Sequence, residues 1–149
     1  PSLWARINDG KTAQRRRAKF VVGILVDLEV SLAALASATD NDGDLVENYK
    51  ERVVEIAEDF LSELIDGLGD DAPDGLEDLA ETIEDLEVED ADYSEDEARK
   101  AAADAAASVA SVAKNISKML ADGKELKLEG VDEFMEDTVE PKGEAYSRK

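Results

Sequence analysis

Apolar residues recur every three or four positions over most of this chain, which predicts a protein built from α-helices. A helix is predicted from residue 45 to about 68, with a buried side made of Val46, Tyr49, Val53, Ile56, Phe60, Leu64 and Leu68. A shorter helix follows, and its apolar positions are Leu76, Leu79, Ile83 and Leu86. The last long helix, from 95 to about 122, is rich in alanine and would bury Ala98, Ala102, Ala105, Val109, Val112, Ile116 and Met119 or Leu120.

The N-terminal region predicts a short helix over residues 2–9, a break at Gly10, and then one long helix over 12–38. The first half of this long helix is basic and the second half is apolar. Asp27 and Ser31 share one side of it, whereas Glu29 points nearly the opposite way, so the apolar half has no broad polar face. We therefore expect it to lie at the centre of a bundle or to contact another chain.

Helix boundaries are predicted from capping residues. Three capping boxes are expected, in which Asp44 pairs with Glu47, Asp74 with Glu77, and Ser94 with Glu97. Glycine favours the left-handed conformation that ends many helices, so Gly67 or Gly69 is expected to end the second long helix and Gly123 the last one.

The C-terminal region changes pattern after residue 123. Leu126 and Leu128 alternate with charged residues as in a short strand, residues 131–137 could form a turn of helix, and residues 138–149 have no apolar period. The fold class expected from the whole pattern is all-α. We expect a helical bundle of about four helices with a basic N-terminal segment in one domain, residues 1–137, followed by an extended C-terminal arm, residues 138–149.

Charge changes this picture more than any other property. The 149 residues include 38 Asp and Glu against 17 Lys and Arg, a net charge of −21. Residues 1–19 carry +5, residues 20–139 carry −27, and residues 140–149 carry +1. Repulsion of this size destabilises a compact state in dilute salt, and it is screened when the Debye length falls to about 3 Å in molar salt. The sequence therefore predicts a fold that depends on salt.

Most enzyme classes are disfavoured by the composition. The chain has no Cys and no His, which removes thiolate chemistry, the commonest general base and the commonest metal ligand. Glycine-rich phosphate loops and nucleophile elbows are also absent from the sequence. We expect a protein that is not an enzyme and that needs no cofactor.

One acidic segment partly matches a calcium-binding loop. With Gly75 at the sixth position, Asp70, Asp74, Asp78 and Glu81 occupy positions 1, 5, 9 and 12 of an EF-hand pattern. Ala72 replaces the ligand at position 3, and in a chain so rich in acid such a match arises easily by chance. The alternative interpretation is an acidic connection between two helices.

The basic and then apolar run over residues 15–38 resembles a secretory signal or a membrane span. Asp27 and Glu29 interrupt it, and each costs about 2.5–3.5 kcal/mol near the centre of a bilayer. We therefore expect no membrane span and no secretion through a signal cleaved at Ala38.

The basic cluster near the N-terminus could bind phosphates, but a body of −27 would repel nucleic acid and high salt would weaken the contacts. Direct nucleic-acid binding is thus the weaker hypothesis, and pairing with an acidic protein surface, including another copy of this chain, is the stronger one. The residues predicted to contact a partner are Trp4, Arg15, Arg16, Arg17, Lys19, Phe20, Val139 and Tyr146.

In composition the whole chain resembles proteins of salt-loving archaea and their viruses, with many acids, few lysines and abundant Ala and Val. A small helical bundle with a basic start and a C-terminal arm is also similar in outline to the head–tail adaptors of tailed viruses, which form a ring under the portal. That resemblance implies a homo-oligomeric structural protein that contacts other virion proteins, in the virion or the cytoplasm of a high-salt host. An acidic assembly chaperone or DNA-mimicking regulatory module, and a calcium-responsive binding protein, are the alternatives.

Overall fold

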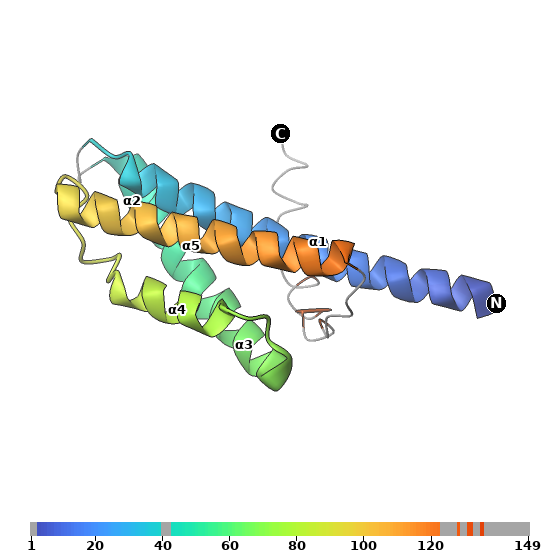
Figure 1. Ribbon diagram of the computed structural model, residues 1–149. Helices are drawn as coiled ribbons and strands as arrows, with labels where there is room; N and C mark the ends of the chain where they lie inside the picture. The colour runs from blue at the N-terminus through green and yellow to red at the C-terminus, as the bar shows by residue number, and fades with distance from the viewer. Residues whose placement is uncertain (1–2, 40–42, 123–127, 129–130, 133–134, 136–149) are drawn as a thin grey trace.

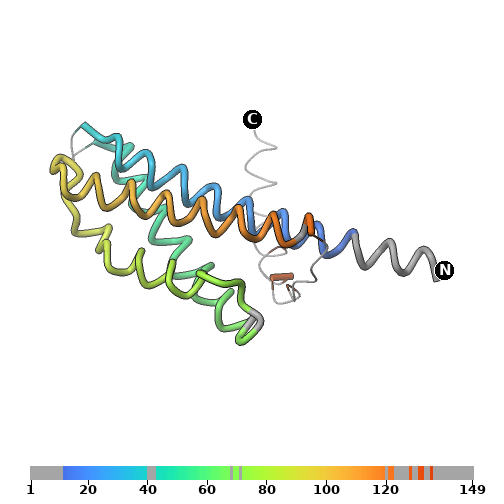
Figure 2. Tube along the Cα trace, viewed as in Figure 1, coloured from blue at the N-terminus to red at the C-terminus, as the bar shows by residue number. Residues whose placement is uncertain are grey.

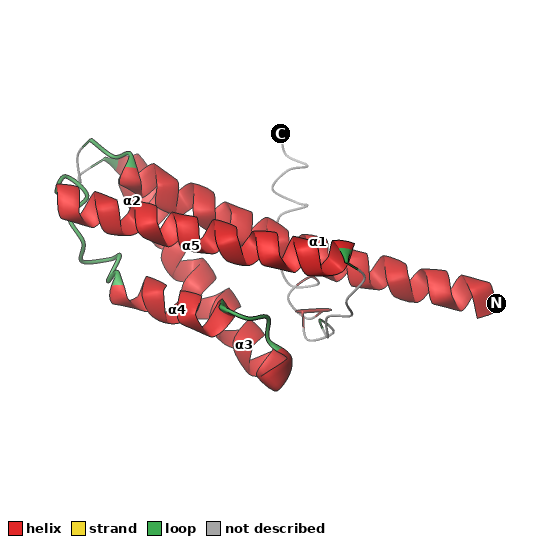
Figure 3. Ribbon diagram, viewed as in Figure 1, coloured by secondary structure: helices red, strands yellow, loops and turns green. Residues whose placement is uncertain are grey.

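The computed structural model describes residues 3–39, 43–122, 128, 131–132 and 135. Its elements are α1 (Leu3–Ala36), α2 (Asp44–Glu55), the π-helical segment η1 (Ile56–Leu61), α3 (Ser62–Leu68), the short 3₁₀ turn η2 (Gly69–Asp71), α4 (Leu76–Asp85) and α5 (Asp96–Ala121). Figure 3 shows that the described part is helical, without strands. Because α2, η1 and α3 follow one another without a break, the bundle has four helical units and the predicted all-α fold class is confirmed.

The first helix is longer than the sequence predicted. The break expected at Gly10 is wrong, since α1 continues through it as one helix of 34 residues. A single glycine costs a helix interior only about 1 kcal/mol, and there is no proline within α1 to remove a hydrogen bond. The helix that the sequence divided in two is therefore one continuous rod.

The second helical unit buries the side that its apolar period predicted. Val53, Ile56, Phe60 and Leu64 are buried, while the acidic side chains on the other side of the unit are exposed. The period did not reveal that the backbone changes to π-helical geometry over η1. A π-helical segment shifts the residues after it around the axis, and here it lies where the unit faces α4.

The helices form two layers. The two long helices α1 and α5 lie side by side, and their contact is the most extensive one between the described helices (Figure 1). The second layer is formed by α2, η1, α3 and α4, where α2 packs against α1 and α4 packs against both α5 and η1. Small alanines at 102, 105, 106 and 113 on α5 are buried. Their size allows the close approach of α1 and α5.

None of the three predicted capping boxes forms. The residue that precedes α2 is Gly43, and the residue that precedes α4 is Gly75; neither helix has a side-chain cap. The last helix begins at Asp96, and the amide and hydroxyl of Ser94 instead donate hydrogen bonds to Asp92 Oδ1 at 3.0 and 2.6 Å. Each helix still has two acidic residues in its first turn, where the helix dipole favours negative charge without a cap.

Glycine is required by the backbone at two turns around α3 and α4. Gly69 ends α3 with a φ of 53°, as one of the two predicted C-cap positions. Gly75 precedes α4 with a φ of 87°, and a Cβ there would lie 3.4 Å from Val112 Cγ2 of α5. A side chain at either position would be strained, because L-residues rarely adopt such angles.

One lysine is buried at the junction of the two layers. The Lys50 side chain on α2 is 5% exposed, and its Nζ donates a hydrogen bond of 2.9 Å to the Ala91 carbonyl. The same Nζ lies 5.6 Å from the centre of the buried Tyr93 ring and 3.9 Å from Glu47 Oε1. Burial raises the pKa of Tyr93. Lys50 thus holds the connection between α4 and α5 against α2.

Lys50→Met is expected to lower the free energy of unfolding by about 1–3 kcal/mol, because the Ala91 carbonyl loses its buried donor. Urea titration at constant high salt measures this. Lys100→Met removes the same charge from an exposed position on α5 and should change the stability by less than about 0.5 kcal/mol. Equal effects of the two substitutions would show that only the charge matters and not the hydrogen bond.

The predictions for the C-terminal region are tested only in part. Val131, Asp132 and Met135 have helical backbone, in agreement with the turn of helix expected over 131–137, and Leu128 and Val131 are buried. Leu128, one of the two residues predicted to form a short strand, is not in a strand, whereas Leu126, Gly123 and the arm over 138–149 lie outside the described residues.

Candidate interaction surfaces

The basic segment lies where α1 leaves the bundle. Arg15, Arg16 and Lys19 are exposed and make no ion pair among the residues that the structure describes. Among the α1 side chains that are described, Ala18 is the first that is buried. In Figure 1 the N-terminal part of α1 extends beyond the end of α5, and Figure 2 traces the same two helices side by side. This extension therefore carries basic residues where it leaves the bundle, and its described contacts are with the C-terminal turn of helix, at Asp132 and Met135.

Arg17 is engaged inside the chain. Its Nε and Nη2 donate hydrogen bonds of 2.8 and 2.9 Å to the two carboxylate oxygens of Asp132, and this bidentate pair joins α1 to the C-terminal turn of helix. The hydrogen bonds from Arg17 hold the pKa of Asp132 below its ordinary value. Arg17 was predicted to contact a partner, and the structure gives it an internal role.

Arg17→Gln is expected to raise the pKa of Asp132 towards its ordinary value of about 3.9. Because the folded pKa is the lower one, the pair stabilises the fold above the unfolded pKa, and this contribution disappears as the pH falls through the folded pKa. An NMR pH titration of the Asp132 carboxyl carbon measures the shift. Arg16→Gln removes the same charge from the exposed neighbour and serves as the control. An equal shift in both variants would contradict a specific pair.

The other predicted contact residues have different surroundings. Phe20 is partly buried and packs edge-to-face on Phe60, with ring centres 5.9 Å apart at an angle of 66°. It therefore forms part of the contact between the two layers. Trp4 lies on the helical backbone of α1, although its side chain is outside the description, and Val139 and Tyr146 lie outside the described residues.

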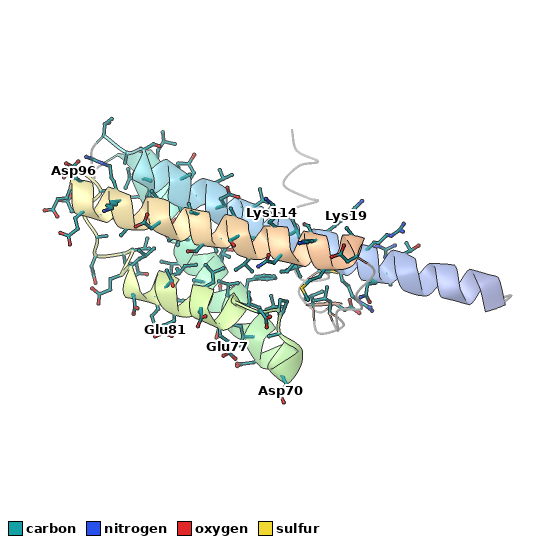
Figure 4. All side chains as sticks on the ribbon, viewed as in Figure 1. Lys19, Asp70, Glu77, Glu81, Asp96 and Lys114 are labelled. Carbon is teal, nitrogen blue, oxygen red and sulfur yellow. The ribbon has the colours of Figure 1, made fainter. Side chains whose placement is uncertain are left out.

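Charge is divided between the two layers. Residues 44–95, which include α2, α3 and α4, hold 21 acidic and 2 basic residues. By contrast α1 holds six basic and three acidic residues, and α5 holds four basic and three acidic ones. Figure 4 shows Asp70, Glu77 and Glu81 along the outer side of α3 and α4, with Lys19 and Lys114 on the two long helices. The sequence shows an excess of acidic residues over the whole of residues 20–139 but does not show this difference between the layers.

The outward side of α1 is also uncharged after Lys19. Gly23, Val26, Val30, Ala33 and Ser37 are all exposed and follow one another at intervals of three or four residues. Val26 is 43% exposed and Val30 is 55% exposed. Together with Leu45 on α2 they are the large apolar side chains that are exposed in the described part of the chain. The sequence showed that this helix lacks a broad polar side, but not which apolar residues face outward.

The acidic loop places its carboxylates on the surface. Asp70 lies in η2, Asp74 precedes α4, and Asp78 and Glu81 lie on α4; all four are exposed. Over the part of the chain that the structure describes, no three His, Cys, Asp or Glu side chains are grouped so that they could hold a metal ion. The calcium hypothesis gains no support from this placement.

A cavity of about 340 Å³ lies between the second helical unit and α4. Its floor is apolar and includes Val53, Ala57 and Ile83, and its rim is acidic and includes Glu58 and Glu84. Glu87, also at the rim, has a φ of 46°, a conformation that costs a non-glycine residue free energy. The cavity could receive an apolar group that carries positive charge, and nothing in the sequence pattern indicated it.

None of the described helices combines the length and the apolar character needed to cross a bilayer, in agreement with the expectation drawn from Asp27 and Glu29. Comparison of the chain with protein-family models, with curated proteins and with solved structures gave no match. The two layers and their surfaces are therefore the basis for a functional proposal.

Proposed function

We propose that the protein is a non-enzymatic subunit of a protein assembly, with the α1–α5 layer turned towards its neighbours and the acidic layer turned towards the solvent. The observation that carries the proposal is the division of charge between the layers. Interface cores are depleted of charged residues because a buried unpaired charge costs several kcal/mol. Of the two layers, the α1–α5 layer is the one that a neighbour can cover at low cost.

The extension of α1 supports the same proposal. Tertiary packing supplies most of the stability of helices in proteins, and among the helical residues before Ala18 the described contact is the pair of Arg17 with Asp132; these residues also include Gly10. Contact with a neighbouring subunit would stabilise this extension. Its exposed Arg15 and Arg16 can meet an acidic surface on that neighbour.

More specifically, we propose that the protein is a head–tail connector subunit in the virion of a high-salt host. The outline of the fold and the acidic composition support this role. Such a subunit forms a ring, whose mass is a whole-number multiple of 16.1 kDa. Negative-stain electron microscopy of the purified protein in high salt would show the ring directly.

The second candidate function is an acidic module that holds a basic partner, and the cavity between η1 and α4 favours it. A module of this kind can remain a monomer and bind a basic peptide with an apolar side chain. Ala57→Arg would fill the cavity and place a positive charge beside its acidic rim. The substitution should therefore abolish binding of the basic peptide without changing the native mass.

Native mass spectrometry and sedimentation in molar salt decide between the two. An assembly subunit should exceed 16.1 kDa at micromolar concentration, and its mass should fall on dilution. Deleting residues 138–149 should leave the helical content unchanged and lower the native mass, since we expect the arm to hold neighbours. A protein that stays at 16.1 kDa at every concentration and salt contradicts the proposal.

A further inference from the structure

The outward side of α1 is the feature of this molecule least suited to exposure. A chain with a net charge of −21 places charged residues on the outer sides of α2, α4 and the acidic connections. On α1, by contrast, Gly23, Val26, Val30 and Ala33 are exposed with no charged residue among them. Single exposed apolar residues are ordinary, but an uncharged row over three helical turns in so acidic a protein marks a surface that is covered.

We propose that this row, named here the α1 seam and made of Gly23, Val26, Val30 and Ala33, binds the same seam of a second copy in antiparallel orientation. The inference rests on the proposed function in its general form, an assembly subunit, and names one interface of it; this contact pairs two copies, whereas a ring also needs head-to-tail contacts. The spacing of the seam is three, four and three residues, which reads the same in both directions about position 28. An antiparallel pair therefore places Val26 opposite Val30 of the second copy, and Gly23 opposite Ala33.

The small residues at the two ends of the seam allow the helices to come close. Gly23 and Ala33 would face each other twice, once at each end, so that the valines in the middle can interdigitate. Such a contact is isologous, because the same surface is used by both copies around a two-fold axis, as in most protein dimers. α5 lies beside α1 and would enter the same interface.

Charge at the two ends of α1 selects the antiparallel orientation. Arg15, Arg16 and Lys19 are exposed before the seam, whereas α2 begins soon after it and exposes Asp44 and Glu47 in its first turn. An antiparallel pair brings the basic end of each α1 towards the acidic end of the other. A parallel pair would bring two basic ends together, which like-charge repulsion disfavours.

The association is tested with exposed residues that do not affect the core. Val26→Glu with Val30→Glu should weaken self-association at least tenfold, measured as the dissociation constant by sedimentation in molar salt. Ser62→Glu with Thr82→Glu is the matched control, since it adds the same two charges at exposed positions of α3 and α4, in the acidic layer away from the seam. Circular dichroism should show the parent helical content in both variants.

The orientation is tested by disulfide formation. The chain has no cysteine, so each introduced cysteine is the only thiol of its copy. In the antiparallel pair, positions 26 and 30 of two copies are opposite, whereas 26 and 26 are offset by about 6 Å along the axis. Combined with the lateral separation of two packed helices, this offset puts the two Cα atoms beyond the distance of about 7 Å that a disulfide can bridge. A mixture of Val26→Cys and Val30→Cys proteins should therefore form a heterodimeric disulfide, and each variant alone should not. Disulfides within each variant alone would overturn the antiparallel orientation.

The outcomes separate this inference from the proposed function. If the parent assembles and Val26→Glu with Val30→Glu assembles equally well, the seam is not an interface, while the protein remains an assembly subunit. If Ser62→Glu with Thr82→Glu weakens association as much as the seam variant does, added charge alone is responsible and the seam proposal is overturned. If the parent is a monomer under all conditions, the proposed function and the inference both fail.

Discussion

Phe60→Ala is expected to lower the free energy of unfolding by about 3–5 kcal/mol, as large-to-small changes in a packed core do. Phe60 is 7% exposed and lies in η1, the segment of the second helical unit that faces α4. Its ring packs edge-to-face on Phe20 of α1. The substitution therefore removes apolar burial and one aromatic pair, and it leaves a cavity between the two layers.

Urea is the suitable denaturant for this measurement, because guanidinium chloride is itself a salt and would change the screening. The titration should be run at constant molar KCl, with Glu58→Ala as the control on the exposed side of the same segment. The control should change the stability by less than about 0.5 kcal/mol. A loss below about 1 kcal/mol for Phe60→Ala would mean that the ring does not contribute to the core as the structure indicates.

Transfer from molar to millimolar salt is expected to unfold the protein or to lower its melting temperature strongly. The 21 acidic residues over 44–95 repel one another, with only two basic residues among them. Screening reduces this repulsion most between exposed charges that lie more than a Debye length apart. At this chain length, a loss of about 3 kcal/mol lowers the Tm by about 10 °C.

Thermal melts in KCl, from about 20 mM to about 3 M and followed by circular dichroism, measure the effect of salt on the melting temperature. A variant with Glu77→Gln, Glu81→Gln and Glu84→Gln on the outer side of α4 should depend less on salt, because three repelling charges are removed. Equal melting temperatures at the two ends of the salt series would contradict the high-salt adaptation that the composition suggests.

The buried side of the second helical unit could be predicted from the sequence. Val53, Ile56, Phe60 and Leu64 are buried because an apolar residue at every third or fourth position can only be covered on one side of a helix. The same reasoning located the buried Ala102 and Ala105 of α5, but it missed Ala106 and Ala113, and Ala98 is only partly buried. Local periodicity thus finds the centre of a buried side, whereas the width of that side depends on how the helices pack.

Helix boundaries were harder to predict from the sequence. The chain offers so many acids that almost any helix start has Asp or Glu at the spacing of a capping box, and the structure uses Gly43 and Gly75 instead. The break at Gly10 was wrong for a related reason, since one unfavourable residue does not end a helix when the residues on both sides favour it.

The surfaces could not be predicted, because they depend on which helices pack together. Val26 and Val30 face outward only because α5 and α2 cover the other sides of α1. The internal pairing of Arg17 with Asp132 joins residues 115 positions apart, and no local pattern reveals it. The division of charge likewise follows from the pairing of α1 with α5, the first and last long helices of the chain.

The unequal charge of the two layers also gives the molecule a permanent dipole moment directed from the acidic layer towards the α1–α5 layer. On a positively charged surface, such as an anion-exchange resin or an amine-coated sensor, the molecule should adsorb with α2–α4 down. The seam on α1 would then point away from the support. Immobilised copies should thus capture further copies from solution efficiently, whereas random attachment through lysines on α1 and α5 would block that side.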